Sequence, residues 1–120
     1  MKVCHIINSL NRGGAETHLL DLCKEQITNG LEVEVVSIGH DKVNIFSIQN
    51  EISKLNIKIH RLKGPRMFNP FSYIKLKMII NYKNFDVIHT HQPRSDYMIF
   101  IIKKIIIFIK RIIKFNQYIK

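Results

Sequence analysis

Residues 2–28 read KVCHIINSLNRGGAETHLLDLCKEQIT, a short hydrophobic run followed by a loop and a patterned segment. Residues 2–7 are rich in β-branched side chains, which predicts a buried strand. Residues 8–14 have the composition of a loop and end in Gly13 and Gly14. Residues 15–28 place leucines at helical spacing, and Asn29-Gly30 is a typical helix end. This order predicts the first strand, loop and helix of a βαβ unit.

The rest of the chain repeats that alternation. Three further segments have strand patterns: residues 31–38, 57–62 and 85–90. Helical patterns occur at residues 42–55, 71–81 and 95–114. Connections of this length favour parallel strands joined by crossover helices. We therefore predict the α/β class, with a Rossmann-like parallel sheet of about four strands and flanking helices. Ligands bind such sheets beyond the carboxyl ends of the strands.

The composition is that of one globular domain. The chain has 120 residues, of which 46% are hydrophobic and 23% are charged, which excludes a wholly disordered protein. The two cysteines, Cys4 and Cys23, match no metal-binding or disulfide spacing and predict reduced thiols in a cytosolic core. No signal peptide and no uncharged window of transmembrane length is visible. We expect a cytoplasmic protein.

Basic charge is concentrated at the end of the chain. Residues 98–120 contain six lysines and arginines and no acidic residue, whereas residues 1–97 are nearly balanced. We expect two pieces, a domain at 1–97 and a basic tail at 98–120. Two readings of the tail remain open: an aberrant end from a frameshift or truncation, or an amphipathic helix at 101–120 lying on an anionic membrane surface at the inner face. Aromatic residues do not alternate with basic ones, so we expect no nucleic-acid partner.

The glycine pair is the first candidate binding site. Without Cβ atoms, Gly13 and Gly14 would let backbone N–H groups approach a phosphate at a helix N-terminus. The alternative is a plain tight turn that needs positive φ. Arg12 could contact an anionic ligand, or could simply be solvated. Glu16 is expected to complement the helix dipole.

Two histidines close the last predicted strand. Alternation places His89 and His91 on one face, and His91, at the carboxyl end, is the better ligand-binding candidate. No Asp, Glu or Cys cluster accompanies the pair, so we predict no metal site. His89 and His5 read as core residues. The remaining histidines have no partner pattern and read as structural: His18, His40 and His60.

Three segments together resemble a known family. They are KVCHIINSLNRGGAETHLLDL at 2–22, NGLEVEVVS at 29–37 and FDVIHTHQ at 85–92. In this order they resemble the N-terminal domain of glycosyltransferase family 4, and the resemblance covers residues 1–97. It implies the GT-B fold, in which two Rossmann-like domains flank the active site. It also implies transfer of a sugar, with retention and usually without a metal, from a nucleotide-sugar donor to a sugar or lipid-linked acceptor.

The resemblance implies a partial enzyme. Arg12, Gly13, Gly14 and His91 would be substrate-binding, with the glycines near the donor diphosphate. No segment matches the family's fifth strand or its nucleotide-sugar domain, so we assign no catalytic residue and no cofactor. We expect an incomplete half of a GT-B enzyme, inactive alone, of the kind that builds cell-surface polysaccharide or glycolipid. The alternative is a non-catalytic Rossmann-like module that binds a phosphorylated ligand at Gly13-Gly14.

Overall fold

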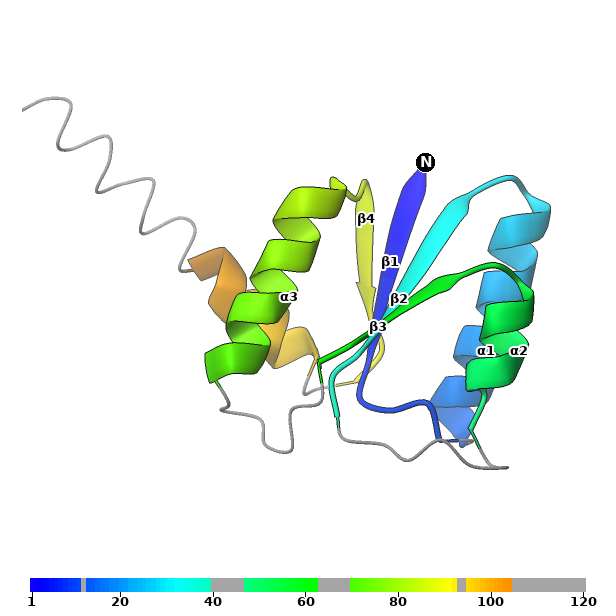
Figure 1. Cartoon of the computed structure of the whole chain (residues 1–120), viewed down its shortest axis with the longest axis horizontal. Helices are drawn as coiled ribbons and strands as arrows, with labels where there is room; N and C mark the ends of the chain where they lie inside the picture. Colours follow the sequence, from blue (N-terminus) through cyan, green and yellow to red (C-terminus); the bar gives the residue numbers. More distant parts are fainter. Residues whose placement is uncertain (12, 40–46, 63–69, 93–94, 105–120) are drawn as a thin grey trace, which may run out of the picture.

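A four-stranded parallel sheet forms the centre of the computed structural model (Figure 1), which describes residues 1–11, 13–39, 47–62, 70–92 and 95–104. The strand order is β3-β2-β1-β4, with β1 paired to β2 and β4 and every pairing parallel. This arrangement confirms the predicted α/β, Rossmann-like class. The strands are β1 (Lys2–Ile7), β2 (Glu32–Ser37), β3 (Lys58–Arg61) and β4 (Val87–Thr90).

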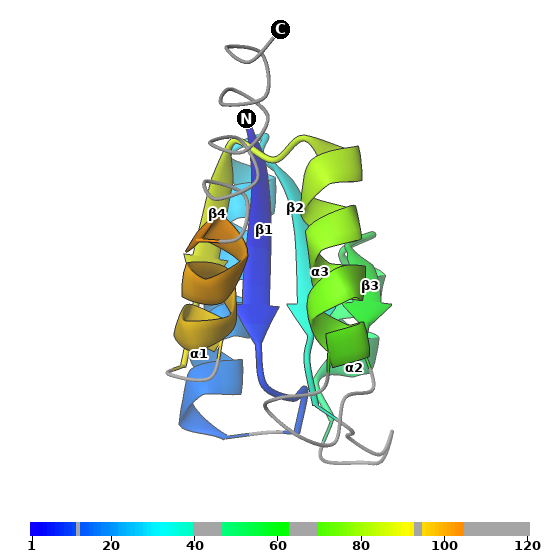
Figure 2. The ribbon, with the colours of Figure 1, turned by 90° about the vertical axis from the view of Figure 1, so that its left-hand side faces the viewer.

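Helices cover both faces of the sheet. On one face lie α1 (Gly14–Thr28) and α2 (Gln49–Lys54). The other face carries α3 (Pro70–Lys83) and the helical residues 95–104, which Figure 2 shows side by side in front of the sheet. The central strand β1 is buried on both faces, which explains why it reads as a nearly continuous hydrophobic run.

Strand alternation divides the core into two layers. Along β1, Ile7 packs toward α1 and α2, whereas Cys4 and Ile6 pack toward α3. Burial raises the pKa of the Cys4 and Cys23 thiols to about 12, so both are protonated at neutral pH. Both cysteines are free and buried, which confirms the prediction of reduced core thiols.

The helix predicted at 42–55 is shorter in the structure. The described helix begins only at Gln49, whose N–H donates to Ser47 Oγ, and residues 42–46 lie outside the described residues. Just before it, the Ile48 N–H donates to Leu10 O at 2.8 Å, and Asn11 bridges Ser47. Residues 47–48 thus pair with the loop after β1. This long-range pairing, which local periodicity does not reveal, competes with an earlier helix start.

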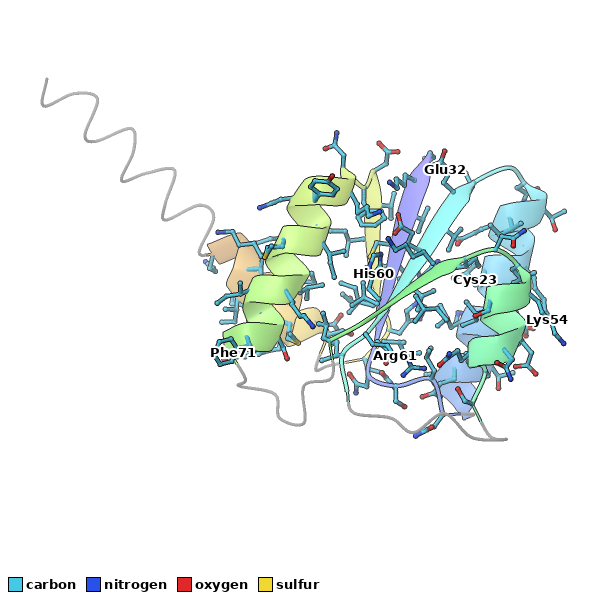
Figure 3. The ribbon with its side chains drawn as sticks, viewed as in Figure 1. Cys23, Glu32, Lys54, His60, Arg61 and Phe71 are labelled. Carbon is cyan, nitrogen blue, oxygen red and sulfur yellow. The ribbon has the colours of Figure 1, made fainter. Side chains whose placement is uncertain are left out.

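A charged cluster lies on the α3 face of the sheet. The nearly buried Glu34 accepts a hydrogen bond from His60 Nε2 at 2.7 Å, and Lys2 Nζ and Lys83 Nζ lie 3.4 and 3.9 Å from its carboxylate (Figure 3). Burial alone raises the pKa of Glu34, but the His60 hydrogen bond and the charge of Lys83 outweigh it and hold the pKa below its ordinary value. His60 therefore has a structural role, as expected, through a partner that the sequence pattern did not indicate.

The outer face of α3 carries an apolar stripe, which we call the α3 stripe: Phe71, Ile74, Met78 and Tyr82. These side chains are between 56% and 87% exposed. Phe71, near the start of α3, is labelled at the lower end of that helix in Figure 3. The opposite side of α3 packs Leu76 against the sheet. Within the described residues no helix is long and apolar enough to cross a membrane.

Candidate functional site

The candidate site lies where β1 and β4 end and α1 begins, at the lower edge of the sheet in Figure 1. Because the strands are parallel, their carboxyl ends meet at this edge, and the N-terminus of α1 lies there too. The Asn8 N–H donates to Gln92 Oε1 at 2.7 Å, which joins the loop after β1 to the loop after β4. Gln92, which the sequence analysis did not single out, thereby holds the two loops together.

The glycine pair forms the start of α1. Gly13 is the N-cap residue with an extended backbone (φ −164°), so the positive φ considered for this turn is wrong. No side chain caps the helix, and the first backbone bond runs from the Thr17 N–H to Gly13 O at 3.0 Å. The N–H groups before Thr17 therefore have no acceptor within the helix. The pair is distinguished by its missing side chains, not by its backbone conformation.

The two glycines have different surroundings. A Cβ atom on Gly13 would lie 2.8 Å from Glu16 Oε2, whereas a Cβ on Gly14 would meet no atom of the described residues within 4 Å beyond its own helix and chain neighbours. Glu16 is only 8% exposed and lies in the first turn, where its charge complements the helix dipole as predicted. The Glu16 carboxylate fills the space beside Gly13. A ligand can therefore approach the N-terminus of α1 only beside Gly14, as far as the described residues show.

Three histidines gather beside this helix, and we call them the histidine cluster: His5, His89 and His91. His5 on β1 pairs in register with His89 on β4, and His91 follows two residues later on the same face. His5 Nδ1 lies 2.9 Å from His91 Nε2, and the rings of His89 and His91 stack with centroids 4.2 Å apart. Sequence alternation correctly placed His89 and His91 together but did not reveal His5.

Helix α1 contributes two residues to the surroundings of the cluster. Gln26 Oε1 lies 2.7 Å from His5 Nε2, and because an amide oxygen only accepts, this contact places a proton on Nε2. His18 lies one turn after Gly14, and its ring is edge-on to His91 with centroids 6.4 Å apart. The first turns of α1 and the end of β4 therefore belong to one region. His18, read as structural, adjoins the candidate site.

Burial keeps two members of the cluster neutral. It lowers the pKa of His5, which is fully buried, and it lowers the pKa of His91 to about 4, with the neighbouring His89 and His5 adding to the effect. Both side chains are therefore neutral imidazoles at pH 7. A neutral imidazole can donate one hydrogen bond and accept another, or bind a metal through its lone pair.

One buried polar atom at this edge has no partner among the described residues. Asn8 Oδ1 is inaccessible to solvent and accepts no hydrogen bond there. Asn8 directly follows β1, and its own N–H is held by Gln92. The remaining predicted site residue, Arg12, lies outside the described residues, as does His40, which the sequence predicted to be structural.

Comparisons with known proteins agree on one family. The chain matches Glycosyltransferase Family 4 over residues 12–113. It is also similar to the capsular polysaccharide biosynthesis glycosyltransferase CapH of Staphylococcus aureus, with 33% identity over 91 residues. That match covers 76% of this chain and 24% of the relative, so the chain spans about a quarter of the relative's length.

Proposed function

The chain belongs to glycosyltransferase family 4, and we propose that it is the acceptor-side part of a retaining enzyme that transfers a sugar from a nucleotide-sugar donor. In this proposal the complete enzyme has the GT-B fold, and the donor lies between this domain and a second one. The observation that carries the proposal is the open N-terminus of α1 at Gly14, at the carboxyl edge of the sheet.

Gly14 would contact the donor diphosphate. The first N–H groups of α1 have no helical acceptors, and the helix dipole adds partial positive charge at this end. Gly14 has no Cβ, and apart from its chain neighbours and its own helix no atom of the described residues lies within 4 Å of that position, so a phosphate oxygen can approach the backbone. Arg12, next in the chain to Gly13, would add positive charge. These residues would bind and orient the donor rather than take part in bond breaking.

The end of β4 would contact the acceptor. The neutral His91 can accept a hydrogen bond from a sugar hydroxyl or donate one to it. We propose an acceptor of the cell-surface polysaccharide or glycolipid type. The relative's name, which assigns it to capsular polysaccharide biosynthesis, supports this class of acceptor.

A transfer assay tests the proposal directly. The chain alone should give no sugar transfer, and transfer should appear when it is combined with a donor-binding domain of the same family. Calorimetry with the chain alone distinguishes the alternative function, a module that binds a phosphorylated ligand by itself. Tight stoichiometric binding of a nucleotide sugar to this chain would favour that module and contradict the proposed division of labour between two domains.

We also propose that the α3 stripe rests on an anionic membrane at the cytoplasmic face, where a lipid-linked acceptor would be reached. The stripe is flanked by Lys75 and Lys77, and the neighbouring 95–104 helix adds Lys103 and Lys104. Exposed apolar side chains with adjacent lysines suit a leaflet of anionic lipids. The tail segment 105–120 lies outside the described residues, so the stripe carries this proposal.

Vesicle co-sedimentation tests the membrane contact. We expect the chain to bind vesicles of anionic lipid, and the double variant Ile74→Ser, Met78→Ser to bind at least about 10-fold more weakly because it loses apolar burial. Val87→Thr, an exposed position on the edge strand β4, serves as the matched control and should bind normally. Equal binding by the double variant and the control would show that the stripe makes no contact with the membrane.

A further inference from the structure

We propose that His5, His89 and His91 bind a divalent transition-metal ion of the zinc class. The inference rests on the placement of three imidazoles by two neighbouring strands. It goes beyond sugar transfer, for which the resemblance to the family implies no metal. It also replaces the expectation of no metal site, which was based on the His89–His91 pair alone.

The strand register assembles the ligand set. His89 and His91 project from the same face of β4, and His5 is the cross-strand partner of His89 on β1. One ring nitrogen from each of the three lies within 4.8 Å of the others. Zinc–nitrogen bonds of about 2.0–2.1 Å place tetrahedral ligand nitrogens about 3.4 Å apart. The distance from His5 Nδ1 to His91 Nε2 is 2.9 Å, slightly shorter than this ideal separation. The largest separation within the cluster, up to 4.8 Å, is longer than the ideal. Modest rotations of the side chains would bring the three nitrogens to one ion.

Gln26 accepts a hydrogen bond from His5 and so holds the ring of this metal ligand in place. A metal-bound histidine usually donates its other ring N–H to an oxygen, which fixes its tautomer and orientation. His5 does this through Nε2 and Gln26 Oε1 at 2.7 Å, so its Nδ1 lone pair faces the cluster. The His5 side chain is fully buried, so its orientation is fixed before an ion arrives. Neutral imidazoles at pH 7 are also the form that binds metals.

The donor set selects the class of ion. All three ligands are imidazole nitrogens, which suit Zn²⁺, Co²⁺, Ni²⁺ and Cu²⁺, whereas Mg²⁺ and Mn²⁺ prefer oxygen. In the described part of the chain no carboxylate or thiolate joins the cluster. Three protein ligands leave a fourth position for water or for an oxygen of a bound ligand. Bound metal would also link β1 to β4, the outer strand of the described sheet.

The test uses the full chain, freed of metal with a chelator and titrated with Co²⁺ or Zn²⁺. We expect one equivalent of Co²⁺ to produce the intense visible absorption of a tetrahedral or five-coordinate ion. Saturating Zn²⁺ should raise Tm by about 5 °C or more, because it binds only the folded state. Mg²⁺ should produce neither effect. A chain that gives no cobalt spectrum and no zinc-dependent rise in Tm would overturn the proposal.

Single substitutions then locate the ion. His89→Gln and His91→Gln should each abolish the cobalt spectrum. Gln26→Ala should weaken binding by about 10-fold, because it removes the hydrogen bond that orients His5. His60→Gln, on the opposite face of the sheet, is the matched control and should bind as the wild type does. Thermal melts in chelator confirm that each variant is folded. Unchanged binding in folded His89→Gln and His91→Gln, or loss of binding in His60→Gln, would place the ion elsewhere and refute the assignment.

Discussion

Gly14→Val will leave the domain folded and reduce sugar transfer by about 100-fold when the chain is combined with its donor-binding domain. Outside its own helix and chain neighbours, none of the described residues has an atom within 4 Å of the position that a Cβ atom would occupy, so the described fold accommodates the new side chain. The same side chain would fill the space through which a phosphate reaches the first N–H groups of α1. Misplacement of a substrate by about 1 Å can cost about two orders of magnitude in rate. Steady-state kinetics and a thermal melt of the isolated domain measure the two halves of this prediction.

The matched control is Lys24→Val, which places the same β-branched residue at an exposed position further along α1. It should transfer sugar at the wild-type rate. Gly13→Val is a poor alternative because its Cβ would approach Glu16 Oε2 to 2.8 Å, so a loss of activity would mix a structural effect with a binding effect. Wild-type activity in a folded Gly14→Val enzyme would show that the glycine pair is only a turn and does not contact the donor.

The domain will lose stability in mild acid because of the histidine cluster. His5 and His91 have pKa values lowered by burial, that of His91 to about 4, against an ordinary value of 6.5. The unfolded chain therefore binds protons that the folded chain does not, as pH falls through 6.5 toward 4. Stability is full above pH 6.5 and decreases across this window. We expect a loss of about 1–3 kcal/mol by pH 4.5 and a Tm lower by at least about 5 °C.

Thermal melts between pH 7.5 and 4.5 in the presence of chelator measure this dependence. His91→Gln should flatten the curve, because glutamine does not titrate, while His5 keeps a residual slope. The titratable groups that act on His91 are His89, His5, His18 and Asp96. The three histidines lower the pKa of His91, and Asp96 acts in the opposite sense and raises it. Glu34 contributes only at lower pH, since its pKa is also depressed. Equal slopes in wild type and His91→Gln would rule out His91 as a source of the acid sensitivity.

The fold was predictable because its signals are local. The β-branched run at Lys2–Ile7 coincides with β1, and the predicted helix at 15–28 differs from α1 by one residue. The end of α1 was also readable from Gly30, which adopts the left-handed conformation that favours glycine, whereas the helix predicted at 71–81 continues to Lys83 and is followed by the left-handed Asn84. The start of α2 was not predicted, because residues 47–48 pair with a loop more than 35 positions earlier in the chain.

The amino-acid sequence alone therefore determined the class of fold, and it predicted the edge of the sheet at which the candidate site lies and two residues found there, Gly14 and His91. The spacing of hydrophobic residues and the presence of turn-forming residues are local features of the sequence, so they can be recognised without knowledge of the fold. Only the tertiary structure decided that Gly14 is open while Gly13 is covered by Glu16, and that His5 joins His91 across 86 positions of the chain. The contact between His5 and His91 depends on strand order and register, and register is set by packing over the whole sheet rather than by any local pattern.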